Sequence, residues 1–264
     1  MLKGAIHTHS TYSDGEMTLS ELREIFMAAG CAFVCLTDHA EFFDRDTLEA
    51  YVAECRRLSD ERFRFIAGLE YSCENRCHVL GFGVTSLVTT TDPQEVIRHI
   101  ERSGGVSVIA HPMESAFEWI ESFDALPNGI ETWNSKYDGR SGPRPSTFAL
   151  LKRLQQREPY MRAFYGQDLH WKNQYRGLFN MVGCQSPSRE GILNAFKSGD
   201  YFAIKDELEL PSSGDLPLKL IESFRRKNDR SVHRRQLIKR VKKAMDRLGL
   251  KVPAPLKAQL RRIF

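Results

Sequence analysis

The sequence lacks several features that would place it in a particular class of protein. No apolar run reaches 18 residues, so we expect no membrane-spanning helix. The first residues lead directly to a histidine motif at His7, which leaves no room for a signal peptide and favours a cytoplasmic protein. None of the six cysteines forms a C-x-x-C pair, and we expect reduced thiols in the core or in loops rather than metal ligands. We find no internal repeat and no low-complexity tract.

The length and the charge of the chain limit the number of domains and the partners it can have. A chain of 264 residues with 41% hydrophobic content can bury a full core, as one barrel-sized domain or as two small ones. Its net charge of +4 conceals a strong asymmetry. Residues 1–215 hold 22 basic and 31 acidic side chains, a net of −9, whereas residues 216–264 hold 16 and 3, a net of +13. The sequence therefore predicts an acidic body followed by a basic tail.

Strand-like apolar runs alternate with helix-like segments along the body. We expect helices over residues 19–29, 46–58, 93–103, 145–156 and 188–198. The first has the clearest boundaries, because Thr18 and Glu21 form a capping-box pattern and Gly30 can end the helix. The six or seven predicted strands are nearly continuous apolar runs, as in strands buried on both faces. This order predicts an α/β fold built on a parallel barrel over residues 1–210.

The remaining residues differ in composition from the body. Residues 211–217 are rich in Pro, Ser and Gly and predict a linker, so a chain ending at Asp215 should keep a folded body. Residues 218–264 form the basic tail, of which residues 218–250 have the pattern of an amphipathic helix. Three partners remain open for this tail: the acidic body itself, an anionic membrane surface contacted peripherally, or nucleic acid bound through its phosphates.

The histidines mark the candidate site. Six of the eight lie at or just beside the ends of short apolar runs, in the company of carboxylates. Strand C-termini are where barrel enzymes carry their catalytic groups, and many imidazoles and carboxylates on one rim indicate a cluster of metal ions. The predicted ligands are His7, His9, Asp14, His39, Glu70, His78, His111, Asp168 and His170. We expect Asp38 to support a neighbouring ligand, and we expect His99 and His233 to bind no metal.

In order and spacing, these motifs over roughly residues 4–206 resemble the PHP family of metal-dependent phosphoesterases. The resemblance implies a distorted (β/α)7 TIM-like barrel, extended here by the basic helical tail, with two or three divalent ions (Mn, Fe or Zn) at the strand C-termini. It implies that one ion is bound by His7, His9, Glu70 and Asp168, that Glu70 bridges to a second ion bound by His78 and His111, and that Asp14, His39 and His170 bind a third.

The resulting functional hypothesis is a cytoplasmic phosphoesterase acting on a small phosphate ester, such as a nucleotide or a sugar phosphate. Attack by a metal-bound hydroxide would depend most on Glu70, Asp168 and His111. Candidate phosphate-binding cations follow the motifs, namely Lys136, Arg140, Arg144, Lys172 and Arg176, and Trp133 or Trp171 could stack on a ring. The alternatives are a nuclease that holds nucleic acid with the tail and a non-catalytic, metal-stabilised binding protein.

Overall fold

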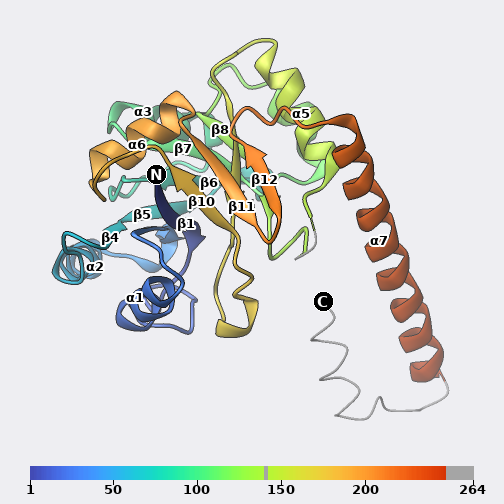
Figure 1. The fold of residues 1–264 in the computed structure, drawn as a ribbon, viewed down its shortest axis with the longest axis horizontal. Coiled ribbons are helices and arrows are strands. Elements are labelled where there is room, and N and C mark those ends of the chain that lie inside the picture. The colour runs from blue at the N-terminus through green and yellow to red at the C-terminus, as the bar shows by residue number, and fades with distance from the viewer. Residues whose placement is uncertain (140–141, 248–264) are drawn as a thin grey trace.

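The computed structural model describes residues 1–139 and 142–247 (Figure 1). The strands are β1 (Leu2–Thr8), β2 (Phe33–Leu36), β3 (Asp38–His39), β4 (Arg64–Ile66), β5 (Gly68–Ser72), β6 (His78–Phe82), β7 (Val106–Ala110), β8 (Gly129–Asn134), β9 (Arg162–Gly166), β10 (Phe179–Val182), β11 (Tyr201–Lys205) and β12 (Leu208–Pro211). The α-helices are α1 (Leu19–Ala28), α2 (Arg45–Arg57), α3 (Pro93–Arg102), α4 (Phe117–Glu121), α5 (Pro145–Gln155), α6 (Arg189–Ser198) and α7 (Leu218–Arg247). Short 3₁₀ turns are η1 (Ala40–Phe42), η2 (Glu74–Arg76), η3 (Glu114–Ala116) and η4 (Lys172–Gln174).

The five helices predicted from the sequence are confirmed, because their boundary signals are local. The Thr18 hydroxyl accepts a bond from the Glu21 backbone N–H at 3.3 Å, and the Glu21 carboxylate accepts one from the Thr18 N–H at 2.9 Å. The Asp92 carboxylate caps α3 by accepting a bond from the Gln94 N–H at 2.9 Å, and Pro93 lies in the first turn. Gly199 ends α6 in the left-handed conformation, at φ 83°. Each side-chain bond satisfies a backbone group that the helix end would otherwise leave unpaired.

The strands form two mixed six-stranded sheets, in the orders β12-β11-β10-β1-β2-β4 and β3-β5-β6-β7-β8-β9. The α/β class is confirmed, whereas no closed parallel barrel is found within residues 1–139 and 142–247. The pairs β5–β6, β6–β7, β1–β10, β10–β11 and β11–β12 are antiparallel. A continuous apolar run indicates that a strand is covered on both faces. It does not indicate whether the strand runs parallel or antiparallel to its neighbours, and the prediction of an all-parallel barrel was wrong for this reason.

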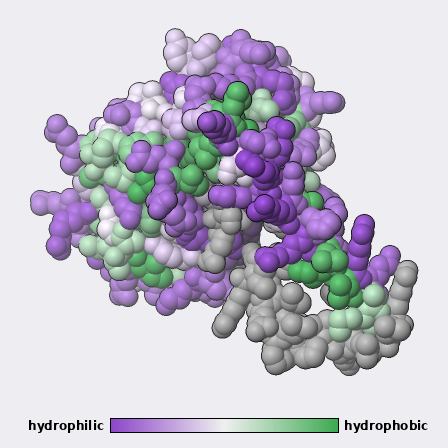
Figure 2. Space-filling model, turned by 45° about the vertical axis from the view of Figure 1, so that its right-hand side comes forward, coloured by the Kyte–Doolittle hydropathy of each residue, from purple (hydrophilic) through white to green (hydrophobic). Residues whose placement is uncertain are grey.

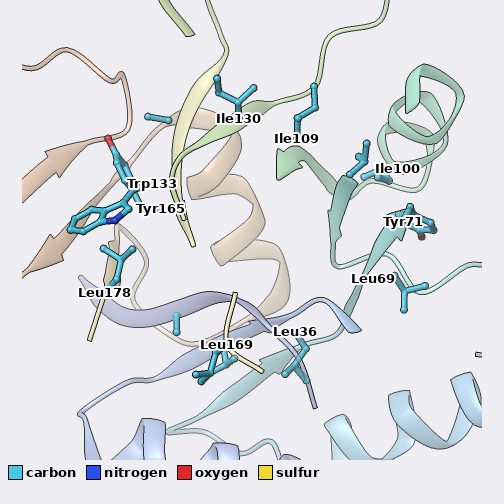
Figure 3. Packing of buried hydrophobic residues seen from close by; sticks show 14 of the residues in the cluster. Leu36, Leu69, Tyr71, Ile100, Ile109, Ile130, Trp133, Tyr165, Leu169 and Leu178 are labelled. Carbon is cyan, nitrogen blue, oxygen red and sulfur yellow. The ribbon is translucent and has the colours of Figure 1, made fainter. Parts of the chain in front are cut away.

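The core lies between the sheets and the helices. Trp133, Tyr165 and Leu178 lie together on one side of it, and each is fully buried (Figure 3). The Trp133 indole N–H donates to the Gly139 carbonyl at 2.9 Å, so its polar group is satisfied inside the protein. Trp133 therefore packs the core and is not the ring-stacking residue that the sequence allowed. All six cysteines are free thiols.

The chain between β12 and α7 packs against the body. Ser212 donates its hydroxyl proton to the Gly199 carbonyl at 2.6 Å, and Asp215 forms an ion pair with Lys152. Phe224, in the second turn of α7, is 1% exposed and belongs to the main core cluster. The predicted linker is thus packed against the fold, and the first turns of the predicted tail contribute to its core.

Beyond Phe224, α7 extends away from the sheets (Figure 1). The face in Figure 2 is mainly hydrophilic, with apolar residues in separate groups. Among the described helices, even the 30-residue α7 is too polar to cross a membrane. The end of the predicted tail helix and all later residues, 248–264, lie outside the described residues.

Candidate metal centre

The two sheets meet where the end of β1 runs beside the segment that follows β9. Thr8 bridges Leu169 in parallel, and the His9 N–H donates to the Leu169 carbonyl at 2.9 Å. This pairing places His7 and His9 next to Asp168 and His170, although the two motifs are more than 150 residues apart in the sequence. The strand pairing, rather than any local motif, thus builds one half of the site.

The hairpin of β5 and β6 brings in the other half. Glu70 lies in the middle of β5, and His78 opens β6, opposite Ser72. Because β6 runs antiparallel to both neighbours, its first residue lies opposite Ala110, the last residue of β7, beside His111. His78 therefore reaches the same rim from the start of an antiparallel strand rather than from the C-terminus of a parallel one.

All nine predicted ligands converge. They form four overlapping groups, and in each group one ligand atom per residue lies within 4.8 Å of the others. The groups are His9 with Asp14, His39 and His170; His7 with His9 and Asp168; His7 with Glu70 and His111; and His39 with Glu70 and His78. Imidazole and carboxylate donors of this kind suit Zn, Fe and Mn ions.

The buried Glu70 carboxylate lies at the centre of the cluster. Its Oε1 is 2.6 Å from Nδ1 of His78 and 3.4 Å from Nε2 of His111. Its Oε2 is 3.2 Å from Nε2 of His7 and 3.1 Å from Nε2 of His9. Burial alone would raise the Glu70 pKa, but His7 and the other imidazoles hold it well below its ordinary value. The two oxygens thus face different pairs of imidazoles, as in a carboxylate that bridges two ions.

Asp14 forms a second centre, nearer to the surface. Its Oδ1 lies 3.2 Å from Nε2 of His170, 3.7 Å from Nδ1 of His9 and 3.8 Å from Nε2 of His39. Three imidazoles around one carboxylate oxygen leave room for a cation between them, since only the His170 distance is that of a direct hydrogen bond.

His9 provides the sharpest test of whether the residues fit metal ions. Its ring is fully buried, and although Nε2 lies 3.1 Å from Oε2 of Glu70, neither ring nitrogen makes a well-aligned hydrogen bond. Burial lowers its pKa to about 4, so the ring is neutral near pH 7. A buried imidazole without hydrogen bonds is costly in an ordinary core, and a neutral imidazole is the form that binds a metal. The residues present therefore fit the ions that their pattern implies.

The backbone is strained at three of the candidate ligands. His7, His111 and Asp168 have φ values of 58°, 31° and 51°, a region that non-glycine residues seldom adopt. Such a conformation costs about 1–3 kcal/mol per residue and persists only where the surroundings enforce it. Strain of this kind often accompanies function, because it orients a side chain in a way that a relaxed strand does not.

Glu131 belongs to the site and was missed by the sequence analysis. This buried residue of β8 accepts a bond from Nδ1 of His7 at 2.7 Å, and one from the backbone N–H of His111 at 2.9 Å. The Asn134 amide donates to both Glu131 and Asp168. The bond to Nδ1 turns Nε2 of His7 toward Glu70, as supporting carboxylates do in metal sites. The available signal was a lone carboxylate within the apolar run of residues 129–133.

Three other residues considered from the sequence belong to none of the ligand groups. Asp38 accepts bonds from the Ser10 N–H at 2.8 Å and the Ser13 hydroxyl at 2.7 Å, and so fixes the loop that carries Asp14. His99 bonds to Ser86 at 2.6 Å, away from the cluster. His233 lies on α7 and, like Asp38 and His99, belongs to none of the four groups.

The cationic side chains predicted to bind substrate differ in how close they lie to the ligand cluster. Lys136 contacts the cluster, with Nζ 3.0 Å from Oδ1 of Asp168. Arg144 pairs with the buried Asp138 and donates to the Pro112 carbonyl at 3.0 Å. Lys172 is exposed on η4, and Arg176 is half-buried just after it. Arg140 lies outside the described residues. Trp171 is 45% exposed, with its ring centroid 5.7 Å from that of His170.

A cavity of about 710 Å³ opens beside the cluster. Its lining includes His78 and His111 at the metal side, Tyr137 and Arg144 after β8, and Val232 from α7. Cavities of roughly this size commonly hold small-molecule ligands. The site therefore combines candidate metal ligands, a cation and an adjoining space for an organic group.

Comparisons with known proteins found similarity in sequence and in fold. The chain is 29% identical over 77 residues to the DNA polymerase/3'-5' exonuclease PolX of Bacillus subtilis, a match that covers 26% of the chain and only 14% of that relative. A two-domain protein from Bacteroides vulgatus, described as containing a predicted PHP-like metal-dependent phosphoesterase, has a similar fold. Its TM-score is 0.54 at 17% identity, over 79% of this chain and 66% of that one.

A second solved structure shares the fold. An amidohydrolase from Chromobacterium violaceum, with bound sulfate and no metal, has a TM-score of 0.51 at 16% identity, over 75% of this chain and 96% of that one. The model of the PHP domain matches residues 5–186, which hold all nine converging ligands. The chain belongs to the PHP domain family.

Proposed function

We propose that this protein is a metal-dependent phosphoesterase that hydrolyses a small phosphate ester. The observation that carries the proposal is the convergence of six imidazoles and three carboxylates into overlapping groups that share Glu70, His7, His9 and His39. Shared ligands imply neighbouring ions, and isolated structural sites more often use closed four-ligand cages. Divalent ions bound there would supply Lewis acidity toward phosphoryl oxygens and lower the pKa of a water nucleophile.

The protein's own residues would hold and orient these groups. Glu70 would bridge the two inner positions, and Asp14, His39 and His170 would form the outer one. Glu131 fixes His7 and the His111 backbone, and Asn134 fixes Asp168. Lys136 would contribute a positive charge at the rim, where an anionic ester enters. We therefore assign Glu70, Asp168 and His111 to catalysis through the ions that they would hold.

Metal removal and reloading test this proposal. Protein stripped with a chelator should lose hydrolysis of a panel of nucleotide and sugar phosphates, and Mn²⁺, Fe²⁺ or Zn²⁺ should restore it. His233→Ala is a matched control, because it removes an imidazole outside the four groups. A fully reloaded protein that hydrolyses no phosphate ester would contradict the proposal and would favour a non-catalytic, metal-stabilised binding protein.

A nuclease is the second candidate, and the position of α7 favours it. This helix borders the cavity at Asn228 and Val232 and carries exposed cations further along, including Arg234, Lys239 and Arg240. A polynucleotide with its end in the site could lie along these cations. The relative that is named a 3'-5' exonuclease lends the idea limited support, since the match spans only 14% of that protein.

Oligonucleotide assays separate the two candidates. A nuclease should degrade single-stranded DNA, and its binding should weaken steeply with salt, because each neutralised phosphate releases a counterion. Deletion of residues 234–264 should then abolish DNA binding while hydrolysis of small esters persists. Binding to anionic vesicles instead of DNA would identify a membrane surface as the partner of the tail, and loss of stability alone would indicate docking on the body.

A further inference from the structure

The cavity beside the cluster collects side chains that are unusual for a protein surface. Met113 is 49% exposed, Tyr137 is 52% exposed and Val232 is 41% exposed, and they come from the η3 loop, the loop after β8 and α7. Single exposed apolar residues are ordinary, but three from separate elements that line one concave space indicate a binding surface. The Tyr137 ring lies 4.6 Å from the His111 ring, so this surface begins at the metal cluster.

The buried Phe224 fixes how α7 faces this cavity. Phe224, Asn228 and Val232 follow one another at four-residue spacing, which places them on one side of a helix. Phe224 enters the core, and Asn228 and Val232 line the cavity one and two turns later. A core anchor on the same side of the helix therefore sets the position of the two cavity residues.

We propose that α7 forms a specificity-determining wall of the active site, where Val232, with Met113 and Tyr137, binds an apolar or aromatic portion of the leaving group of the ester. This proposal rests on the proposed phosphoesterase function and adds the substrate class to it. Asn228 supplies an amide for a polar atom on the same group. The family match ends at residue 186, so α7 lies outside the matched PHP domain, whereas Met113 and Tyr137 lie within it.

The chemistry of the wall determines the expected preference. The phosphoryl group sits at the ions, and the leaving group extends over His111 toward Tyr137 and Val232. An aromatic leaving group removes the apolar faces of three side chains from water, whereas a methyl group reaches none of them. The protein should therefore bind 1-naphthyl phosphate more tightly than methyl phosphate, and a change in the wall should alter the ratio of their kcat/KM values.

Paired substitutions test the wall. Val232→Gln and Met113→Gln keep the approximate size of each side chain but make it polar, and both residues are exposed enough for the fold to persist. Each variant should lower the ratio of kcat/KM for naphthyl phosphate to that for methyl phosphate by roughly tenfold, the effect expected of a lost apolar contact in a pocket. Leu237→Gln is the matched control, because Leu237 is exposed on the same helix but does not line the cavity.

A binding measurement separates this inference from the proposed function. Metal-loaded wild-type protein should bind 1-naphthylphosphonate, a non-hydrolysable analogue, more tightly than methylphosphonate, and Val232→Gln should remove most of that difference. If the binding difference falls but no ester is hydrolysed, the wall is supported and the phosphoesterase proposal fails. If Val232→Gln and Leu237→Gln give the same ratios as wild-type protein, the wall does not select the leaving group and the inference is overturned.

Discussion

Glu70 is the residue on which the proposed site depends most. Its two carboxylate oxygens face separate pairs of imidazoles, so a neutral amide at this position would offer one oxygen where two are needed. We expect Glu70→Gln to lower phosphoesterase turnover by orders of magnitude and to lose at least one bound ion. Turnover, elemental analysis and circular dichroism together check this. A folded variant with full turnover and unchanged metal content would rule out the bridging role.

Glu131 would act on a bound ion through His7, whose Nδ1 donates to it. In Glu131→Gln, the His7 ring should be held less firmly, because its Nδ1 loses a charged acceptor. Metal affinity should fall by about 10–100-fold, as it does when a supporting carboxylate is lost from other metal sites. Competition with a coloured chelator measures this for Glu131→Gln. Glu118→Gln, an exposed carboxylate on α4, is the control and should leave affinity unchanged. Equal affinities in the two variants would show that Glu131 has only a packing role.

Protonation of His7 should couple metal binding to pH. Burial alone would lower the His7 pKa, but the carboxylates of Glu131, Asp168 and Glu70 raise it well above 6.5, so the metal-free ring is protonated near neutral pH. That raised pKa stabilises the metal-free fold fully below about pH 6.5, and the contribution is lost as pH rises through the folded pKa. Metal binding must displace this proton. Calorimetry near pH 7 in two buffers of different ionisation enthalpy should give different observed heats, because the buffer takes up the released proton; the same observed heat in both buffers would contradict it.

At the scale of elements, Phe224 is the most deeply buried anchor among the described residues of α7, with Leu220 packed beside the same core. Phe224 is 1% exposed within the main core cluster, whereas Leu237, three turns later, is 54% exposed. We expect Phe224→Ala to lower the free energy of unfolding by about 3 kcal/mol and Leu237→Ala to change it by less than about 0.5 kcal/mol. Urea titrations of both variants measure the difference. A chain that ends at Asp215 lacks Phe224, so its free energy of unfolding should fall at least as much as that of Phe224→Ala. A chain that ends at residue 233 keeps this anchor and therefore tests the tail alone. Equal effects of the two alanine variants would show that the anchor is absent.

The elements also show what the sequence can and cannot predict. Helix boundaries follow from local chemistry, such as the Thr18 and Glu21 capping pair, and were predicted well. Strand direction depends on pairing between distant segments, and the apolar run of β6 is compatible with either direction. The nine side chains that converge could be selected because histidines and carboxylates recur together at the ends of apolar runs. Glu131 looked like part of an ordinary strand, and the contact of Val232 with the cavity depends on where Phe224 packs.

At the scale of the whole molecule, the two sheets meet at the cluster of candidate metal ligands. The helix α7, which lies outside the matched PHP domain, borders the cavity beside that cluster. The junction at Thr8 and Leu169 and the β5–β6 hairpin bring the ligands together, and α7 borders the adjoining cavity. The central claim is that this cluster binds neighbouring ions. Anomalous scattering from crystals reconstituted with Mn²⁺ tests it most directly. We predict two peaks roughly 3.5–4 Å apart on either side of Glu70, with a third beside Asp14 if the outer group is filled. Fewer than two peaks at saturating metal, or peaks away from Glu70, would contradict it.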